Sequence, residues 1–359
     1  MKRKDVLILV INPGSTSTKA AVFRNDDLVV SSIIRHAPED FAGAASLIDQ
    51  KKARMRLIEE MLEKNGIKQK EFDAVVGRGG LLKPIPSGTY AVGPKMLEDL
   101  STGFASNHAS SLGGIIAYEI GTSFQIPAFV VDPVVVDELQ PVARISGIPE
   151  APRRSIFHAL NAKAVARRHA QKLGDEYEKF NFVVSHMGGG ISVGAHRHGM
   201  VIDVNDALYG EGPFSPERCG GITFEKVVRM CFSREYTEKE MMAFALKNGG
   251  MKAYIGTNDL MAAEEKIKGG DERAALVVEA MAYQTAKEIG AMAAVLHYNV
   301  DSILLTGGLA KSTSFTDSIK SMVGKIAPVA VYPGEDEMLA LALGALRVLK
   351  GEDSAAVYS

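Results

Sequence analysis

Cysteine is scarce in this sequence, and neither sign of charge dominates it. The chain of 359 residues has only two cysteines, Cys219 and Cys231, and no CxxC pair. A disulfide scaffold is therefore excluded, and we expect a reducing compartment. With 41 Lys and Arg against 43 Asp and Glu, the formal charge is −2. Dedicated nucleic-acid binders carry a strong basic excess, so we expect no nucleic-acid partner.

Long apolar runs are absent too. No stretch approaches the ~18 consecutive apolar residues of a membrane span, so we expect no membrane partner. Basic residues at 2–4 precede an apolar run at Val6–Ile11, an order that resembles a short signal peptide. A secretory apolar region needs ~7–15 residues and a small-residue cleavage site, and this run ends at Asn12-Pro13-Gly14. We interpret it as a buried strand and expect a soluble, cytoplasmic protein.

The common nucleotide and metal signatures are missing as well. The sequence has no GxGxxG, so Rossmann dinucleotide binding loses its main support, and it has no HExxH. Gly308–Ser312 approaches the pattern GxxxxGK[ST] but lacks its second glycine. The histidines and cysteines do not have zinc-like spacing.

The length and the apolar spacing predict two α/β domains. A segment with three prolines, 141–152, predicts the boundary between them. Strands are expected at 6–11, 19–23, 73–77, 128–131, 182–185, 191–195, 302–305 and 329–332, and helices at 51–65, 154–173, 272–297 and 338–350.

One unit of strand, polar turn and strand occurs twice. It covers residues 6–23 and returns at 182–195, about half a chain later. Two unrelated hairpins would give this pattern. A duplicated domain, whose two turns face each other across a cleft, would give it as well. Turns rich in Gly, Ser and Thr present the N–H and hydroxyl groups that phosphate oxygens require.

Three polar turns follow apolar strands and are candidates for phosphate binding. Their residues are Asn12, Ser15, Ser17 and Lys19 in the first turn, His186 and Gly188, Gly189 and Gly190 in the second, and Thr306, Gly307 and Gly308 in the third. Arg78 and Asp132 each follow a strand directly, where ligands of α/β sheets collect. The simpler alternatives are a surface arginine in a Gly-rich loop and a turn-forming aspartate before proline.

Residues 190–194 also fit GxSxG, the nucleophile elbow of α/β hydrolases, with Ser192 at its centre. The elbow requires a strand, a sharp turn at the serine and then a helix. Here Ser192 stands in an apolar alternation that continues into His196-Arg197-His198-Gly199, which predicts a hairpin.

Together these segments resemble the acetate and butyrate kinase family, within the actin, hexokinase and heat-shock-chaperone ATPase fold. The similar blocks extend over nearly the whole chain: VINPGSTSTK (10–19), GRGG (77–80), SNHASSLG (106–113), VVDP (131–134), SHMGGGISVGAH (185–196), PFSPERCGG (213–221), LLTGGLAKS (304–312) and YPGEDEMLALALGALRVL (332–349). The wording of NPGSTSTK, GEGPFSPER and PGEDEM is closer to the butyrate kinases than to the acetate kinases.

The resemblance implies two duplicated ribonuclease-H-like (actin-like ATPase) domains around a central cleft. The first would cover 1–150 plus 338–359 and hold the first phosphate segment and the carboxylate site. The second would cover 151–337 and hold the second phosphate segment, the adenosine site and the contacts of a homodimer or a larger even assembly.

The resemblance also implies roles for single residues. Arg78 and Arg218 would hold the carboxylate and stabilise the phosphoryl group, and His186 would contact the same group. Asp132, Glu337 and Asn12 would organise Mg²⁺, with Glu335 as the alternative to Glu337. The remaining expected contacts are Asn12, Ser15, Ser17, Lys19, Gly188, Gly189, Gly190, Gly307, Gly308 and Asp259 for ATP or ADP, and His108 for the substrate.

The implied reaction fits the residue types. A carboxylate is already ionised at neutral pH and needs no general base. It needs its charge neutralised, since an anion must attack a polyanion, and phosphoryl transfer depends mainly on positioning and on stabilisation by metal and arginine. We therefore interpret His186 as a hydrogen-bond donor. Closure on ATP would exclude water from the reaction.

Two departures from the acetate kinases bear on specificity. Bulky apolar residues of those enzymes correspond here to Gly80, Asn107 and Ser185, and smaller side chains predict room for butyrate or a branched relative. Met261 follows Asp259-Leu260, where the acetate kinases resemble Asp-Met-Arg, which leaves adenine contacts open.

Three alternatives remain open. They are an acetate or propionate kinase of the same family, a serine hydrolase using Ser192, and a non-catalytic ATP-switch protein of the actin or chaperone type. The sequence does not distinguish straight from branched acids, nor the direction of flux.

Overall fold

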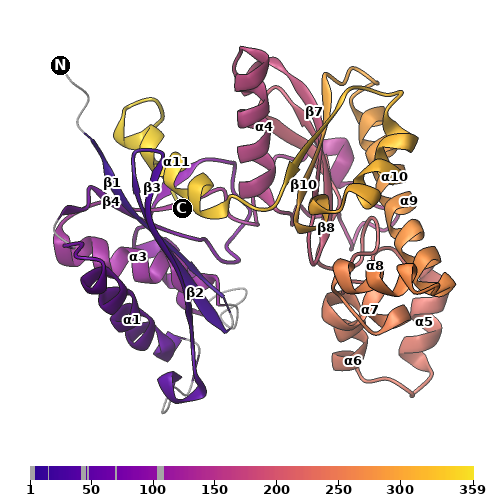
Figure 1. Ribbon diagram of the computed structural model, residues 1–359, viewed down its shortest axis with the longest axis horizontal. Helices are drawn as coiled ribbons and strands as arrows, with labels where there is room; N and C mark the ends of the chain where they lie inside the picture. Colours follow the sequence, from indigo (N-terminus) through magenta and orange to yellow (C-terminus); the bar gives the residue numbers. More distant parts are fainter. Residues whose placement is uncertain (1–4, 15, 42–45, 47, 69–70, 103–108) are drawn as a thin grey trace. The chain divides into compact units, whose positions relative to one another are not determined.

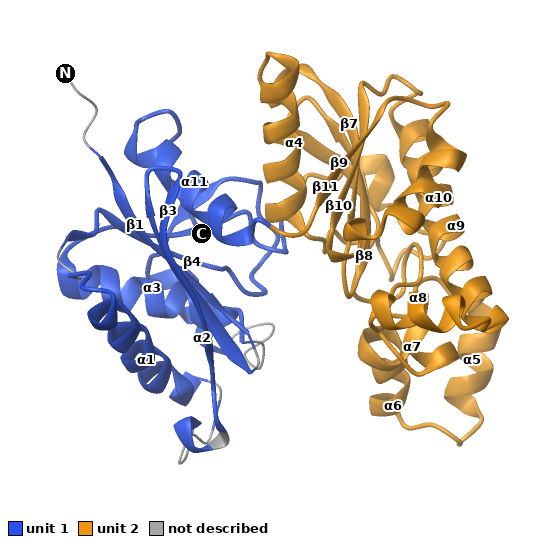
Figure 2. Cartoon of the chain, viewed as in Figure 1, with its two compact units in different colours: residues 1–136, 336–359 blue, residues 137–335 orange. Residues whose placement is uncertain are grey.

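The computed structural model describes residues 5–14, 16–41, 46, 48–68, 71–102 and 109–359. Within it the chain forms two compact units. Unit 1 comprises Met1–Val136 and Asp336–Ser359, and unit 2 comprises Asp137–Glu335 (Figure 2). Each unit has its own sheet and its own hydrophobic core, and each is described separately below.

Unit 1 is built on a seven-stranded sheet of order β12-β5-β6-β4-β1-β2-β3. The strands are β1 (Leu7–Pro13), β2 (Ser17–Arg24), β3 (Asp27–Arg35), β4 (Ala74–Gly77), β5 (Thr89–Ala91), β6 (Ala128–Val131) and β12 (Ala356–Val357). Strands β1, β2 and β3 form an antiparallel meander, whereas β4 pairs in parallel with both β1 and β6. The carboxyl ends of β1, β4 and β6 therefore share one edge of the sheet.

Helices cover both faces of this sheet (Figure 1). They are η1 (Pro38–Phe41), η2 (Ile48–Gln50), α1 (Lys51–Lys64), α2 (Pro94–Thr102), α3 (Ser111–Phe124) and α11 (Glu337–Leu349). Helices α1 and α3 share a core with Leu9, Ile11 and Val130. Gly344 of α11 instead contacts Val131, the next residue of β6. Because neighbouring strand residues point to opposite faces, α11 covers the other side. The last helix thus returns to the first unit, as expected.

Unit 2 has a five-stranded sheet of order β11-β10-β7-β8-β9. Its strands are β7 (Asn181–Met187), β8 (Ile191–Arg197), β9 (Met200–Val204), β10 (Ser302–Gly307) and β11 (Val329–Pro333). Its helices are η4 (Pro141–Arg144), α4 (Ala159–Leu173), η5 (Tyr177–Lys179), α5 (Phe224–Phe232), α6 (Glu238–Ala243), the π-helix η6 (Phe244–Asn248), α7 (Gly250–Ile255), α8 (Leu260–Lys268), α9 (Glu272–Val295), η7 (Gly308–Lys311) and α10 (Thr313–Val323). Helices α9 and α10 pack on the face of Val183 and Val193, whereas α4 reaches β10 through His169 and Ser302.

The two sheets repeat one topology. In unit 2, β7, β8 and β9 form the antiparallel meander, β10 pairs in parallel with β7, and β11 pairs in parallel with β10. Strands β1, β2, β3, β4 and β6 have the same order and directions in unit 1. The mixed α/β fold with two duplicated, ribonuclease-H-like sheets is therefore confirmed.

The sequence analysis placed the change from one unit to the other within 141–152, at residue 150. In the structure the change lies before this segment, between Val136 and Asp137. Gln140 N–H donates to Ile202 O, and the Arg153 guanidinium donates to Ala143 O. These hydrogen bonds attach the proline-rich segment to unit 2. The predicted helix at 154–173 begins only at Ala159. Before it, Arg153 N–H donates to Arg144 O and Ile156 O accepts from Ala207 N–H, so these backbone groups bond outside a helix. On the carboxyl side the chain changes units after Glu335 rather than after residue 337.

Among the described residues, no helix combines the length and the apolar character needed to cross a membrane.

A buried histidine makes the stability of unit 2 depend on pH. His196 is fully buried, and its Nδ1 lies 2.6 Å from the Tyr177 hydroxyl. Burial, with the charges of Lys163 and Arg167, holds its pKa well below the ordinary value. The unfolded chain therefore takes up a proton near pH 6.5 that the folded protein does not, and the contribution of neutral His196 is lost as pH falls below that value.

We expect the free energy of unfolding to fall by about 1 kcal/mol between pH 6.5 and 5.5 on account of His196 alone. His196→Gln should remove that part of the slope in urea titrations. The exposed His297→Gln is the control and should leave the slope unchanged. Equal slopes in the wild type and His196→Gln would contradict the assignment.

Candidate active site

Three predicted residues meet at the carboxyl ends of neighbouring strands in unit 1. Asn12 lies at the end of β1, Arg78 follows β4 and Asp132 follows β6. Strand β4 lies between the other two, so Arg78 stands between Asn12 and Asp132 along the sheet edge. Asn12 and Asp132 are buried, with exposed fractions of 6% and 2%. The fold thus gathers three polar groups that are far apart in sequence.

Glu337, the first residue of α11, joins two of them. Its Oε1 lies 2.8 Å from Arg78 Nη1, and its Oε2 accepts a hydrogen bond of 2.7 Å from Asn12 Nδ2. Glu337 is itself buried. A carboxylate held by an arginine and an amide is fixed in position and balanced in charge.

Asp132 is held in a strained conformation. Its φ is +36°, a region that non-glycine residues seldom adopt. Its Oδ1 accepts from Gly88 N–H at 2.7 Å, while its own N–H donates to Gly88 O at 3.0 Å. Strain of this kind persists where the surroundings impose it and is common at functional sites.

Helix α3 packs unusually close to the Arg78 loop. A Cβ on Gly77 would lie 2.0 Å from Gly113 O, and a Cβ on Gly80 would lie 2.3 Å from Ser111 Oγ. The lack of a side chain at Gly80 is therefore explained by the approach of α3. The space that the sequence analysis assigned to a longer acyl chain is filled there by Ser111.

Three other predicted residues, Ser15, Asn107 and His108, lie outside the described residues. Ser17 and Lys19 stand in β2, where Lys19 pairs with Asn12 across the ladder and is exposed. Residues directly opposite in a ladder share a face, so Lys19 lies on the same face as Asn12.

The other face of the first turn is held by residues that the sequence analysis did not identify. Arg54 is fully buried and donates to Thr18 Oγ1 at 2.8 Å and to Ser17 O at 3.3 Å. His36 Nε2 also lies 2.8 Å from Thr18 Oγ1. Burial lowers the pKa of Arg54 to about 10, so it remains charged at neutral pH. In the sequence, only the place of Arg54 among the apolar positions of a predicted helix could have indicated that it is buried.

In unit 2 the glycine turn joins β7 to β8 and is closed by a hydrogen bond of 2.9 Å from Gly188 N–H to Gly190 O. Gly307 ends the neighbouring β10 with φ +94°, and a Cβ there would lie 2.4 Å from Met187 O. Gly307 also exchanges two backbone hydrogen bonds with Gly334. A Cβ on Gly308 would meet no atom within 4 Å, so this position is open. The second and third predicted turns therefore lie side by side.

Arg218 lies directly on the glycine turn. A Cβ on Gly190 would lie 1.9 Å from Arg218 Nη1, so the guanidinium occupies the space of the missing side chain. Nη1 donates to Ala207 O at 2.7 Å, while Nε is buried without a partner in the part of the chain that the structure describes. Burial lowers the pKa of Arg218. A buried cation with an unused donor is suited to an anion.

His186 lies near the end of β7 and is 1% exposed. Glu335 Oε1 lies 3.3 Å from its Nε2, but within the described ranges neither ring nitrogen has a partner in hydrogen-bonding geometry. Its ring stacks on that of His158 at 4.2 Å. His158 could not be identified from the sequence, because a single histidine before a helix has no distinguishing pattern.

Ser192 is not placed like a hydrolase nucleophile. It lies inside β8, is 2% exposed, and its Oγ lies 2.9 Å from His158 Nδ1. Strand β9 follows β8, so the strand-to-helix turn of the elbow is lacking in this segment.

Ser185 points away from His186. Val183 and Met187, on either side of it in β7, belong to the core beneath α9. Strand alternation places Ser185 on that same face, fully buried. The predicted role of Ser185 as a pocket residue beside His186 therefore disagrees with its orientation.

The carboxylate of Asp259 is used within its own segment, as the cap of a helix. Its carboxylate accepts from Met261 N–H at 2.9 Å and caps α8, and Met261 is 74% exposed. The neighbouring Asn258 instead donates to Glu217 Oε2 at 3.1 Å, and Glu217 Oε1 faces the position of a Cβ on Gly189 at 3.1 Å. In this region Glu217 reaches the glycine turn.

Glu335 and Glu337 belong to different units of the chain. Glu335 is the last residue of unit 2 and lies beside His186 and Gly188. Glu337 lies in unit 1 with Arg78 and Asn12.

A sequence profile described as the acetokinase family matches residues 149–335. This match covers more than half of the chain and includes His186, the glycine turn, Arg218 and Gly307. The chain belongs to the acetokinase family. It is thus a phosphotransferase with a carboxyl group as acceptor, from a family that uses ATP.

Solved structures with the same fold include two acetate kinases and a propionate kinase. Porphyromonas gingivalis acetate kinase has a TM-score of 0.79 and 18% identity, with 96% of this chain and 100% of that chain covered. A propionate kinase from Francisella tularensis gives 0.77 and 18%, covering 94% and 98%. Acetate kinase from Entamoeba histolytica gives 0.75 and 18%, also covering 94% and 98%. At this identity the likeness shows that the acetokinase fold extends over nearly the whole chain.

The contact between Gly190 and Arg218 predicts a variant that loses activity more than stability. In Gly190→Ala the new methyl group must displace the guanidinium, which is the end of a flexible side chain and moves easily. We expect phosphoryl transfer to fall about 100-fold or more, with little change in melting temperature. Gly290→Ala in α9 meets no atom within 4 Å and is the control, with unchanged activity. Full activity in Gly190→Ala would show that the position of Arg218 is unimportant.

Proposed function

We propose that this acetokinase-family protein transfers the γ-phosphoryl group of ATP to butyrate, or to a branched short-chain acid such as isobutyrate. The products are an acyl phosphate and ADP, and the transfer is direct, in-line and reversible. The observation that carries the proposal is the buried Arg218 at Gly190 of the glycine turn, whose Nε has no partner among the described residues. His186 lies beside Gly188 of the same turn. Those groups suit an anionic phosphoryl group.

The reaction joins two anions, and the residues present address that problem. Arg218 and Arg78 are the cations assigned to the phosphoryl group and the carboxylate. An attacking carboxylate oxygen is already ionised, so His186 acts as a hydrogen-bond donor and not as a base. Each charge-assisted hydrogen bond is strongest where charge accumulates in the transition state.

Mg²⁺ is the expected cofactor, and the oxygen ligands of unit 1 fit it. Asp132 and Glu337 provide buried carboxylates, and Asn12 provides an amide. No cluster of three or more metal-binding side chains occurs within the described ranges. Mg²⁺ commonly takes one or two carboxylates, with waters and substrate phosphates as its other ligands. When bound, the ion would neutralise phosphate charge, and these residues would hold it.

The preference for four carbons rests on the wording of the motifs NPGSTSTK, GEGPFSPER and PGEDEM. Gly80 and Ser185 do not support it, because one is packed against Ser111 and the other faces the α9 core. An acetate or propionate kinase of the same family is the alternative.

The test is a hydroxylamine trap assay with ATP, Mg²⁺ and straight and branched acids from acetate to valerate. We expect hydroxamate that requires ATP and whose kcat/KM is highest at four carbons. Each buried CH₂ contributes ~0.8 kcal/mol, so butyrate should exceed acetate by about tenfold. A higher kcat/KM for acetate would reject the butyrate assignment. No product with any acid would reject the proposed reaction.

We also propose that unit 2 pairs copies of the chain as a homodimer or a larger even assembly. Helix α5 has no buried residue, and Phe224, Val228 and Phe232 expose 73%, 37% and 82% of their surface along one side of it. This apolar row is symmetric about Val228. Antiparallel packing of two copies would place Phe224 against Phe232, as a two-fold interface requires.

Replacing both aromatic residues in Phe224→Ser/Phe232→Ser should shift the assembly to monomers in sedimentation velocity, because it removes the apolar area that the pairing buries. Leu173→Ser removes an exposed apolar side chain outside α5 and should leave the assembly unchanged. An unchanged size of the double variant would place the interface elsewhere.

A further inference from the structure

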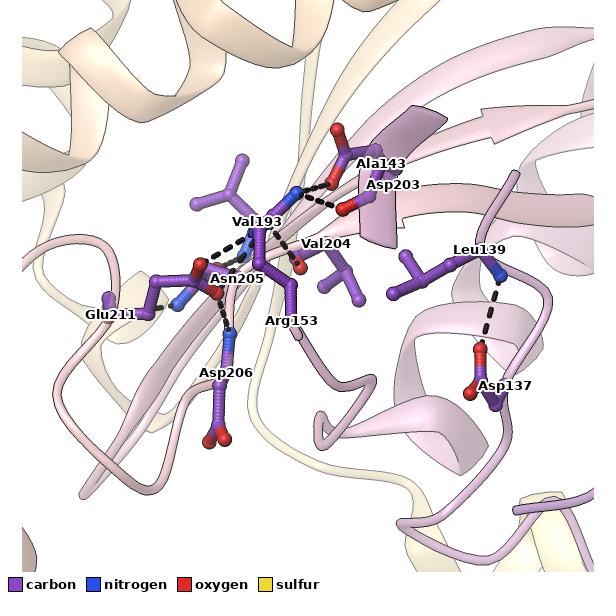
Figure 3. Close-up of polar contacts among 10 residues, drawn as sticks. All are labelled: Asp137, Leu139, Ala143, Arg153, Val193, Asp203, Val204, Asn205, Asp206 and Glu211. Atoms are coloured by element: carbon purple, nitrogen blue, oxygen red, sulfur yellow. Dashed lines mark hydrogen bonds and ion pairs between the residues drawn. The ribbon is translucent and has the colours of Figure 1, made fainter. Parts of the chain in front are cut away.

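Arg153 holds together three segments that none of the roles above explains (Figure 3). Its Nη1 donates to Asp203 Oδ1 and to Ala143 O, both at 2.9 Å, and its Nη2 donates to Val204 O at 3.1 Å. Its Nε donates to Glu211 Oε1 at 2.6 Å. Asp203 and Val204 end β9, whereas Glu211 lies near the end of the loop that follows.

That loop, residues 205–212, is fastened at both ends. Glu211 Oε2 accepts from Asp206 N–H at 2.6 Å, so the carboxylate that binds Arg153 also closes the loop. The fully buried Asn205 accepts from Val193 N–H at 2.7 Å (Figure 3). It also donates to Ile191 O at 3.1 Å. Asn205 thereby anchors the loop to the beginning of β8, next to the glycine turn.

The middle of the loop carries the acceptor for Arg218. Ala207 O accepts from Arg218 Nη1 at 2.7 Å, and Ala207 N–H donates to Ile156 O at 3.0 Å. Ile156 lies between Arg153 and His158 in the same short segment. The segment 153–158 therefore holds the loop at two places. The backbone of Ile156 binds Ala207, and the side chain of Arg153 binds Glu211.

Charge and geometry at Arg153 suit an arginine and not a lysine. Glu211 and Asp203 raise its pKa, and Glu288 of α9 adds a third nearby carboxylate. Its guanidinium uses all three nitrogens on four different residues. A lysine ammonium is one point charge and cannot meet these acceptors together.

We propose that Arg153 is a positioning residue for phosphoryl transfer: it fixes the loop 205–212 so that Ala207 O holds the Arg218 guanidinium over Gly190. The inference rests on the proposed function, in which Arg218 stabilises the transferred phosphoryl group. Arg153 binds Glu211, Glu211 fixes the backbone at Asp206, and the adjacent Ala207 O binds Arg218.

The test compares Arg153→Lys with Arg144→Lys. Arg144 pairs with Asp137 through Nη1 at 2.6 Å and Nη2 at 2.8 Å, so the control also removes a two-bond arginine–carboxylate pair. We expect Arg153→Lys to lower kcat about 10- to 100-fold, with KM for ATP and acid changed less than about threefold, since a small misplacement of a catalytic group affects the rate. Arg144→Lys should retain the wild-type kcat.

A double-mutant cycle distinguishes positioning from a general structural effect. In an Arg218→Lys background, Arg153→Lys should cost less than about twofold more in kcat, because its effect passes through Arg218. A full additional loss in that background, or an unchanged kcat in Arg153→Lys alone, would overturn the proposal.

Hydrogen exchange provides a readout that does not require activity. The amides of residues 206–209 all donate within this network. They should exchange at least about tenfold faster in Arg153→Lys and at the wild-type rate in Arg144→Lys. Unchanged exchange in Arg153→Lys would refute the ordering role. A wild-type enzyme without activity on any acid, together with faster exchange in Arg153→Lys, would instead reject only the proposed reaction.

Discussion

The guanidinium of Arg218 can lie on the second glycine turn only because Gly190 has no side chain. A buried cation normally requires a carboxylate partner, whereas Arg218 donates to a backbone carbonyl and keeps Nε unpartnered within the described residues. Its charge is therefore available for a ligand. Arg218 must therefore be held in place without a carboxylate bound directly to its guanidinium. Arg153, Glu211 and Asn205 hold it indirectly, because they fix the backbone of the loop 205–212.

In unit 1 the corresponding arginine does have a carboxylate partner. There Arg78 is paired with Glu337, and Asn12 holds the second oxygen of that carboxylate. Duplication of the sheet topology gives each unit a set of parallel strands whose carboxyl ends meet at one edge. The residues at those ends differ between the units. Asn12, Asp132 and the Arg78–Glu337 pair lie at the strand ends of unit 1, whereas His186, the glycine turn and Arg218 lie at those of unit 2.

The strands and the duplication could be predicted because they depend on local alternation and on turn residues that short segments display. The α4 start could not, since the residues before Ala159 satisfy their backbone through Ala207, which lies far along the chain. The orientation of Ser185 follows from alternation within β7, which a pocket role beside His186 contradicts. The filled space at Gly80 depends on Ser111, whose approach the sequence does not show. His158, Arg54 and Arg153 have no motif, and their roles follow only from distant partners.

Glu335 and Glu337 show how much the surroundings of two carboxylates can differ at a spacing of two residues. The two carboxylates are two residues apart, yet one contacts the surroundings of His186 and the other binds Arg78. Between them Asp336 is the first residue of the returning segment of unit 1. One residue therefore separates the carboxylate beside His186 from the carboxylate that pairs with Arg78. An insertion or deletion here would shift the beginning of α11 and break either the Glu337 contacts or the Gly307–Gly334 bridge, which constrains the length of this connection as strongly as the identity of its acids.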